Sequence, residues 1–83
     1  MATFGQVPWK HIRKMLDECA PGWRYRDKTH KRWVYYGDYP IFRLPLGPHG
    51  KRQHHSIEVG HVKAMVRHLE IEECARRILK QLG

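Results

Sequence analysis

The spacing of the apolar residues changes twice along this chain, and these changes limit the folds that it can adopt. The first set recurs at intervals of three and four, as on one face of a helix: Trp9, Ile12, Leu16 and Cys19. Pro8 suits the first turn of this predicted helix, and Ala20-Pro21-Gly22 ends it. Helical spacing returns from Val59 to Leu69 and again from Ile71 to Leu82.

Between the predicted helices, aromatic and β-branched residues form three short runs that are typical of strands. The runs are Trp23 to Asp27, Lys31 to Tyr36 and Ile41 to Leu44. Aromatic and polar residues alternate in the first run, which predicts a half-buried strand, and the short connections favour an antiparallel meander. The expected order is α-β-β-β-α-α, an α+β fold with helices on one face of a three-stranded antiparallel sheet.

The length and the charge of the chain narrow its possible functions. A chain of 83 residues can form one domain with a modest core, which excludes large doubly wound and barrel enzymes. Sixteen Lys and Arg residues oppose eight Asp and Glu residues, so the formal net charge is +8. A field of this sign attracts polyanions, and we expect nucleic acid first and an anionic membrane surface second.

The apolar stretches and the cysteines indicate the compartment in which the protein functions. No stretch approaches about 18 apolar residues and the N-terminus has no apolar signal core, so we expect neither secretion nor a membrane span. Cys19 and Cys74 are far apart and form no CxxC motif. We therefore expect two reduced core thiols in a cytoplasmic protein, and neither a disulfide scaffold nor a zinc finger.

Positive charge gathers in two segments of the chain. The first contains a single acid, Asp27, among these cations: Arg24, Arg26, Lys28, Lys31 and Arg32. The second, from Tyr39 to Ile57, contains no acid. This clustering is typical of a surface that follows phosphates, and the alternative is a solvated basic face that keeps the protein soluble.

Aromatic residues interleave with these cations and have two possible uses. They can stack on unpaired bases, or they can supply the core of a small domain. Of the six aromatics from Trp23 to Tyr39, we expect Tyr36 and Tyr39, beside a turn, to be the ones that stay outside the core.

One of the seven histidines is well placed for acid–base chemistry on RNA. Cleavage needs a base that removes the 2′-OH proton and an acid that protonates the leaving 5′-oxygen, and an imidazole suits either role near neutral pH. His30 lies within the densest positive segment, between two predicted strands. The alternative is a surface histidine in a basic turn.

The other histidines have weaker indications. His49, His54 and His55 lie in the polar loop Gly47 to Ser56, where they can supply a second proton-transfer group or bind phosphate. A mobile polar loop is the alternative. No histidine or cysteine pair has the spacing of metal ligands, so we expect no metal site.

Several short motifs occur in one order along residues 8–71. They are Trp9-Lys-His-Ile-Arg-Lys-Met-Leu16, Gly22-Trp23 at a strand entry, Thr29-His30 before a strand, and Leu44-Pro45 with a histidine downstream. The segment Ile57 to Ile71 is similar to the pattern I-x-x-G-T-L-x-x-I-L-x-x-x-G-I. With these motifs the chain resembles the HicA family of bacterial toxins.

The resemblance implies an α-β-β-β-α fold like that of double-stranded-RNA-binding domains. The resemblance covers a core at 8–71 of one domain over residues 1–83, and the predicted helix at about 72–83 is an extra element that the family's minimal pattern lacks. HicA toxins cleave mRNA with one histidine, which matches His30 by position, and a HicB-family antitoxin covers their active site. The family's Gly-Ser-His reads Lys28-Thr29-His30 here, so the hydroxyl is kept and the glycine is lost.

The leading hypothesis is therefore a metal-independent endoribonuclease, the toxin of a type II toxin–antitoxin system. It needs no cofactor, and its expected partners are mRNA and a HicB-like antitoxin. We expect His30 to be catalytic and these residues to bind RNA: Lys28, Thr29, Lys31, Arg32, Arg43, Lys51 and Arg52. The alternatives are a non-catalytic RNA- or DNA-binding module and a mobile-element protein that binds an acidic host factor through the extra helix.

Overall fold

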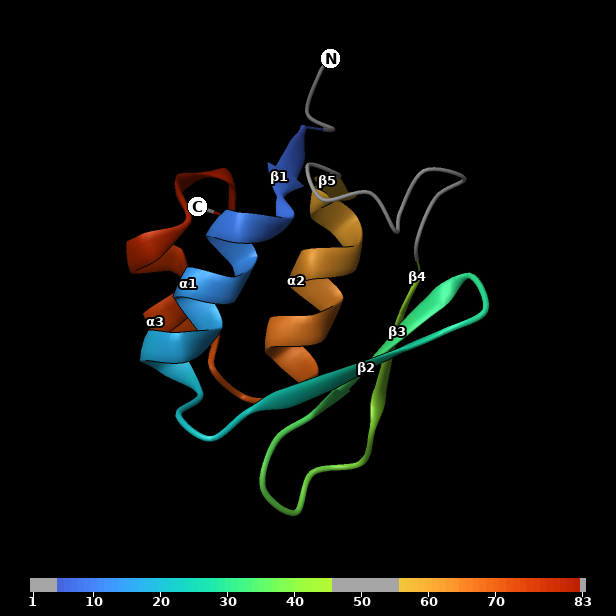
Figure 1. Cartoon of the computed structure of the whole chain (residues 1–83). Coiled ribbons are helices and arrows are strands. Elements are labelled where there is room, and N and C mark those ends of the chain that lie inside the picture. Colours follow the sequence, from blue (N-terminus) through green and yellow to red (C-terminus); the bar gives the residue numbers. More distant parts are fainter. Residues whose placement is uncertain (1–4, 46–55, 83) are drawn as a thin grey trace.

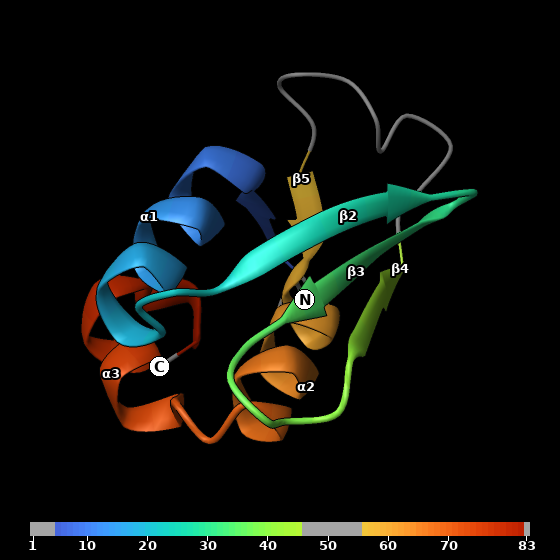
Figure 2. The same ribbon diagram turned by 60° about the horizontal axis from the view of Figure 1, so that its bottom comes forward.

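Helices cover one face of a three-stranded sheet, and no described element covers the other face (Figures 1 and 2). The computed structural model describes residues 5–45 and 56–82. The strands are β1 (Gln6–Pro8), β2 (Arg24–Lys28), β3 (Lys31–Tyr35), β4 (Phe42–Pro45) and β5 (Ser56–Glu58). The helices are α1 (Trp9–Cys19), α2 (Val59–His68) and α3 (Glu72–Ile78), and a 3₁₀ turn, η1, spans Lys80–Leu82.

The central sheet is the predicted antiparallel meander. Its strand order is β2-β3-β4, so β3 is the middle strand. The α+β class, the antiparallel sheet and the order of the helices along the chain are confirmed. The half-buried first strand is wrong: β2 is an edge strand whose residues are exposed or only partly covered, and Tyr25 is 39% exposed.

A second, two-stranded sheet was not predicted from the sequence. In it β1 pairs with β5, with Val7 opposite Ile57. Each of these strands runs directly into a helix, β1 into α1 and β5 into α2, and because the strands are antiparallel the two helices start from opposite ends of the pair. Pro8 is thus the last residue of β1 and the N-cap of α1, one position before the helix.

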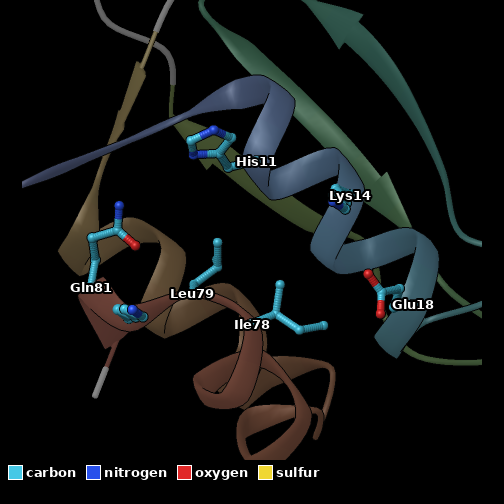
Figure 3. A pocket seen from close by; sticks show the side chains of 7 residues that line it. His11, Lys14, Glu18, Ile78, Leu79 and Gln81 are labelled. Carbon is cyan, nitrogen blue, oxygen red and sulfur yellow. The ribbon is translucent and has the colours of Figure 1, made fainter.

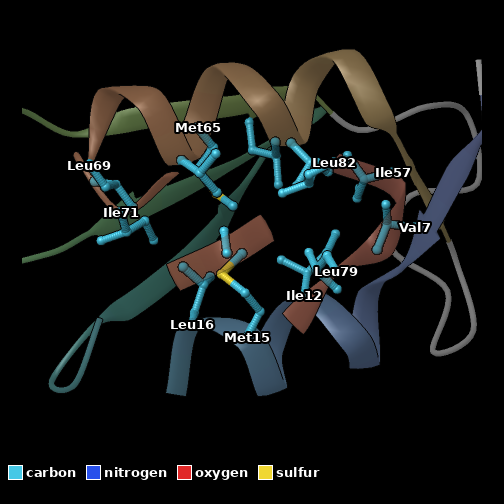
Figure 4. Close-up of a cluster of buried hydrophobic side chains, with 14 of the residues drawn as sticks. Val7, Ile12, Met15, Leu16, Ile57, Met65, Leu69, Ile71, Leu79 and Leu82 are labelled. Carbon is cyan, nitrogen blue, oxygen red and sulfur yellow. The ribbon is translucent and has the colours of Figure 1, made fainter. Parts of the chain in front are cut away.

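One apolar core fills the space between the helices and the inner face of the central sheet (Figure 4). Helix α1 contributes Ile12, Met15 and Leu16, all fully buried, and the spacing predicts the first and the last of these. Val34 and Leu44 contribute from β3 and β4. The remaining fully buried side chains are Val7, Ala20, Ile57, Val62, Met65, Leu69 and Ala75.

The predicted C-terminal helix is interrupted. Helix α3 ends at Ile78, and Leu79 has an extended backbone with φ −106° and ψ 103°. The chain then turns through η1, so that Leu79 and Leu82 are both buried in the core.

A tight turn after α2 places a glutamate in a left-handed conformation. The Glu70 N–H donates to the Arg67 carbonyl at 3.1 Å and the Ile71 N–H donates to the Val66 carbonyl at 2.9 Å, the two bonds of a Schellman motif. The φ of Glu70 is 58°, a region that favours glycine. In the family pattern that Ile57 to Ile71 resembles, this position is glycine.

The two cysteines form a disulfide, so the prediction of reduced thiols is wrong. Cys19, at the end of α1, is bonded to Cys74 in α3, with Cα atoms 5.7 Å apart. The sequence gives no sign of this because 55 residues separate the pair and only the packing of α1 against α3 brings them together. Disulfides persist in oxidising compartments and are rare in the cytoplasm, so the bond does not support the expected cytoplasmic location.

Breaking the disulfide should destabilise the fold. A crosslink between residues 55 apart lowers the entropy of the unfolded chain, and the chain-entropy relation gives about 4 kcal/mol. We expect reduction to lower the free energy of unfolding by about 2–4 kcal/mol in urea titrations. The Cys19→Ser/Cys74→Ser variant is the control, since reductant should not change its unfolding. Two free thiols in the native, unreduced protein would contradict the prediction.

The turn after α2 allows a second stability test. Alanine and glycine at position 70 both remove the carboxylate, but only glycine adopts the positive φ without strain. We expect Glu70→Gly to be more stable than Glu70→Ala by about 1 kcal/mol in urea unfolding. Equal stabilities of the two variants would show that the turn does not hold position 70 in this conformation.

Candidate nucleic-acid interface

The alternation of side chains along β3 divides the central sheet into two chemically different faces. Arg32 and Val34 point toward the helices and are buried, whereas Lys31, Trp33 and Tyr35 point away. The register extends this second face across the neighbouring strands. Its members are Arg24, Arg26 and Lys28 on β2, Lys31, Trp33 and Tyr35 on β3, and Arg43 and Pro45 on β4. We call these eight residues the outer basic face.

Five cations and two aromatic rings make up almost the whole of the outer basic face, and none of its strand positions is acidic. The Lys28 Nζ lies 4.9 Å from the centroid of the Trp33 ring, and the Arg43 guanidinium lies 5.4 Å from the same centroid. The Arg24 guanidinium lies 5.8 Å from the centroid of the Tyr35 ring. Such exposed cation–π contacts contribute about 0.5–1 kcal/mol each, so they orient the cations without fixing them.

The outer basic face places like charges opposite each other. Lys28 pairs directly with Lys31, and Arg26 and Arg43 flank Trp33 in one row across the three strands. Like charges opposite each other destabilise a sheet. No ion pair within residues 5–45 and 56–82 joins any of these cations to a carboxylate. A bound polyanion would relieve the repulsion, which is the electrostatic condition for binding phosphates.

His30 lies at one end of the outer basic face. Thr29 and His30 form the two-residue turn between β2 and β3, directly beyond the Lys28–Lys31 pair. His30 is exposed and has a φ of 59°, a left-handed conformation in which histidine occurs more often than most residues. The structure thus brings together four of the predicted site residues: Lys28, Thr29, His30 and Lys31. Arg43 joins them on the same face of the sheet.

Arg32 does not belong to this surface, and its expected contact with RNA needs correction. Its guanidinium is buried against α1, where it lies 4.3 Å from the centroid of the Trp9 ring. Nε donates to Oδ1 of Asp27 at 2.5 Å, and Nη2 donates to Oδ2 at 3.2 Å. The physical reason is register, because the residue after Lys31 on a strand must face the opposite side. The structure therefore gives Arg32 a role in holding the sheet to α1.

Tyr36 and Tyr39 are not buried in the core, as expected, but they pack against it and lie off the outer basic face. Tyr36 and Tyr39 stack on each other, with ring centroids 5.6 Å apart, and pack against the core. The Tyr39 hydroxyl donates to Oε1 of Glu70 at 3.0 Å, and this hydrogen bond raises the pKa of Tyr39 above its ordinary value. The aromatics that face outward are instead Trp33 and Tyr35. Strand alternation could have identified them once the ends of β3 were known.

The other histidines are either elsewhere or outside the described residues. On α2, the His68 ring nitrogen Nε2 lies 2.7 Å from the Pro40 carbonyl oxygen, and His61 lies 3.7 Å from the Glu58 carboxylate. Five predicted site residues lie outside the described ranges: His49, Lys51, Arg52, His54 and His55.

A hollow on another side of the molecule has a different character (Figure 3). It lies between α1 and the C-terminal segment and has a volume of about 430 Å³. Its lining combines both signs of charge with apolar side chains: His11, Lys14, Glu18, Ile78, Leu79, Lys80 and Gln81. It shares no residue with the outer basic face.

Among residues 5–45 and 56–82, no three His, Cys, Asp or Glu side chains are grouped as metal ligands. None of the helices in these ranges has the length and hydrophobicity of a membrane span.

No protein-family model, curated protein or solved structure matches this chain. The likeness to HicA toxins and to double-stranded-RNA-binding domains therefore rests on the quoted motifs and stays a prediction. What the structure itself contributes is the outer basic face with an exposed histidine at its end.

Two adjacent cations on opposite faces of β3 provide a matched test of the interface. Lys31→Gln should weaken RNA binding and reduce its salt dependence while leaving stability within about 0.5 kcal/mol, because Lys31 is exposed. Arg32→Gln should instead destabilise the fold by about 2 kcal/mol, because it removes a half-buried, hydrogen-bonded pair. Binding isotherms at two salt concentrations and urea unfolding measure the two effects. The reverse pattern would contradict the assignment of the faces.

Proposed function

We propose that this chain is a metal-independent endoribonuclease that cleaves mRNA, with His30 as its acid–base residue. The observation that supports the proposal most is the position of His30, exposed in a turn between paired Lys28 and Lys31 at the end of the outer basic face. The resemblance to HicA toxins points to the same histidine. On this proposal the protein is the toxin of a type II toxin–antitoxin pair.

The proposed reaction needs two proton-transfer groups and cations beside the phosphate, and the turn supplies one imidazole and the cations. His30 acts as the base that removes the 2′-OH proton or as the acid that donates a proton to the leaving 5′-oxygen. The O2′ atom attacks the adjacent phosphorus while the P–O5′ bond breaks, which leaves a 2′,3′-cyclic phosphate and a 5′-hydroxyl. Lys28 and Lys31 stabilise the negative charge that builds on the phosphate oxygens. His49, His54 and His55 are the candidates for the complementary proton transfer.

The antitoxin is implied only by the resemblance to HicA toxins, and the charge of the outer basic face indicates what such a partner would need. A HicB-like inhibitor that covers His30 would need carboxylates opposite the five cations of the outer basic face. Such an inhibitor would exclude RNA and relieve the repulsion between Lys28 and Lys31 at the same time. Its binding should therefore be salt-dependent and should compete with RNA.

A non-catalytic nucleic-acid-binding module is the second candidate. One observation favours it: the described residues at the His30 end of the sheet are Lys28, Lys31 and Pro45, and none of these transfers protons as an imidazole or a carboxylate does near neutral pH. On this reading the charge of the outer basic face performs the whole function. It predicts binding without cleavage.

RNA cleavage in EDTA separates the two candidates. Wild-type protein should cut single-stranded RNA, and His30→Ala should cut it at least about a hundredfold more slowly, because positioned acid–base groups contribute roughly 10²–10⁴-fold. His11→Ala is the matched control, since His11 is exposed on α1 outside the outer basic face, and it should cut at the wild-type rate. RNA binding by His30→Ala is measured in parallel and should remain.

The opposite results are equally informative. Equal cleavage by wild type and His30→Ala would remove His30 from the mechanism. If neither protein cleaves RNA that both proteins bind, the enzyme is rejected and the binding module stands.

A further inference from the structure

We infer that the outer basic face holds an unpaired nucleic-acid strand, with bases stacked on Trp33 and Tyr35 and phosphates bound by the surrounding cations. The inference states which form of nucleic acid the surface takes and how it is oriented. It rests on the proposed function only in naming RNA as the natural strand.

The two rings are arranged as a stacking surface. Trp33 and Tyr35 are two positions apart on the middle strand, so they point to the same side and their Cα atoms are about 7 Å apart. Both are half-buried, and no described element lies over this face. Sheets that bind single-stranded RNA use outward-facing aromatic residues on their strands in this way.

The cations beside the rings do not prevent stacking. Lys28 and Arg43 lie near Trp33, and Arg24 lies near Tyr35, at distances of 4.9–5.8 Å from the ring centroids. A base stacked on an aromatic ring contributes more than one exposed cation–π contact, so a base can displace a cation from the ring. A displaced lysine or arginine remains close enough to bind the phosphate of the same nucleotide.

The rings favour an unpaired strand over the other polyanions that five cations attract. In a duplex the base planes are stacked on each other inside the helix, so a duplex offers this face phosphates, sugars and base edges but no base plane for stacking. An acidic protein surface likewise uses the cations and leaves the aromatic rings without a specific partner. An unpaired strand uses both kinds of side chain.

Because His30 lies beyond one end of β3, it lies near one end of the segment that stacks on the rings. β3 runs from Lys31 to Tyr35, so the rings lie in the middle and at the far end of β3, and the turn with His30 lies just beyond Lys31. A strand that stacks on both rings and continues along β3 reaches the Lys28–Lys31 pair and then His30. The phosphate nearest to His30 is therefore at the end of the stacked segment.

The first test uses the wild-type protein and strands that cannot be cleaved through a 2′-hydroxyl. Fluorescence anisotropy compares a ten-nucleotide thymidine oligomer, an abasic oligomer of the same length and charge, and a DNA duplex. We expect the abasic oligomer to bind at least about tenfold more weakly than the thymidine oligomer, because its phosphates remain and its stacking is lost. Equal affinities of the thymidine and abasic oligomers would overturn the inference.

Variants then assign the base preference to the two rings. Trp33→Leu and Tyr35→Leu should each lower the ratio of abasic to thymidine dissociation constants, whereas the matched control Tyr39→Leu, which lies off the outer basic face, should keep it. A thymidine affinity unchanged in both ring variants would contradict the inference, as would an equal loss for both oligomers. Wild-type binding to polyglutamate as tight as to the thymidine oligomer would make the face a protein-docking surface instead.

These binding results are independent of cleavage. A base-dependent affinity in a protein that does not cut RNA would support the stacking surface and reject the endoribonuclease. RNA cleavage by a protein that binds abasic and thymidine strands equally would support the endoribonuclease and reject the stacking surface.

Discussion

The buried guanidinium of Arg32 is the contact on which the arrangement of this protein depends most. It links β3 to Asp27 on β2 and lies over the Trp9 ring at the start of α1, so one side chain joins two strands and a helix. Because side chains alternate along a strand, fixing Arg32 inward turns Lys31 and Trp33 outward. The inner contact that stabilises the sheet therefore also creates the outer basic face. A shift of register by one residue would exchange the two faces and remove both features.

The rest of the fold leaves that face open. α1 and α2 start from opposite ends of the antiparallel β1–β5 pair and pack on the inner face, and the Cys19–Cys74 disulfide attaches α3 to the end of α1. Tyr39 and His68 join the loop before β4 to the end of α2 and the turn after it through contacts with Glu70 and Pro40. All these contacts lie on the helical side. The other side keeps the uncompensated positive charge, and this division matches a protein whose ligand is a polyanion.

The sequence predicts the regular elements well and their partners less well. The helical spacing from Trp9 to Cys19 and the aromatic run from Lys31 to Tyr36 each reflect local periodicity, and both elements are found. The β1–β5 pair and the disulfide join residues about fifty positions apart, which no local pattern reports. The candidate site likewise combines residues that local sequence predicts with residues whose placement depends on strand pairing. His30 with its flanking lysines was found from local charge, whereas the inward turn of Arg32 and the outward turn of Trp33 needed the register of the sheet.

Mapping of amide chemical shifts during titration with a short thymidine oligomer tests the central claim most directly, because it needs no variant and the oligomer has no 2′-hydroxyl for cleavage. The account predicts that the largest shifts fall on β2, β3 and β4 and on the turn with Thr29 and His30, and that the exposed sides of α1 and α3 change little. Shifts concentrated on α1, α3 or the hollow between α1 and the C-terminal segment would contradict it.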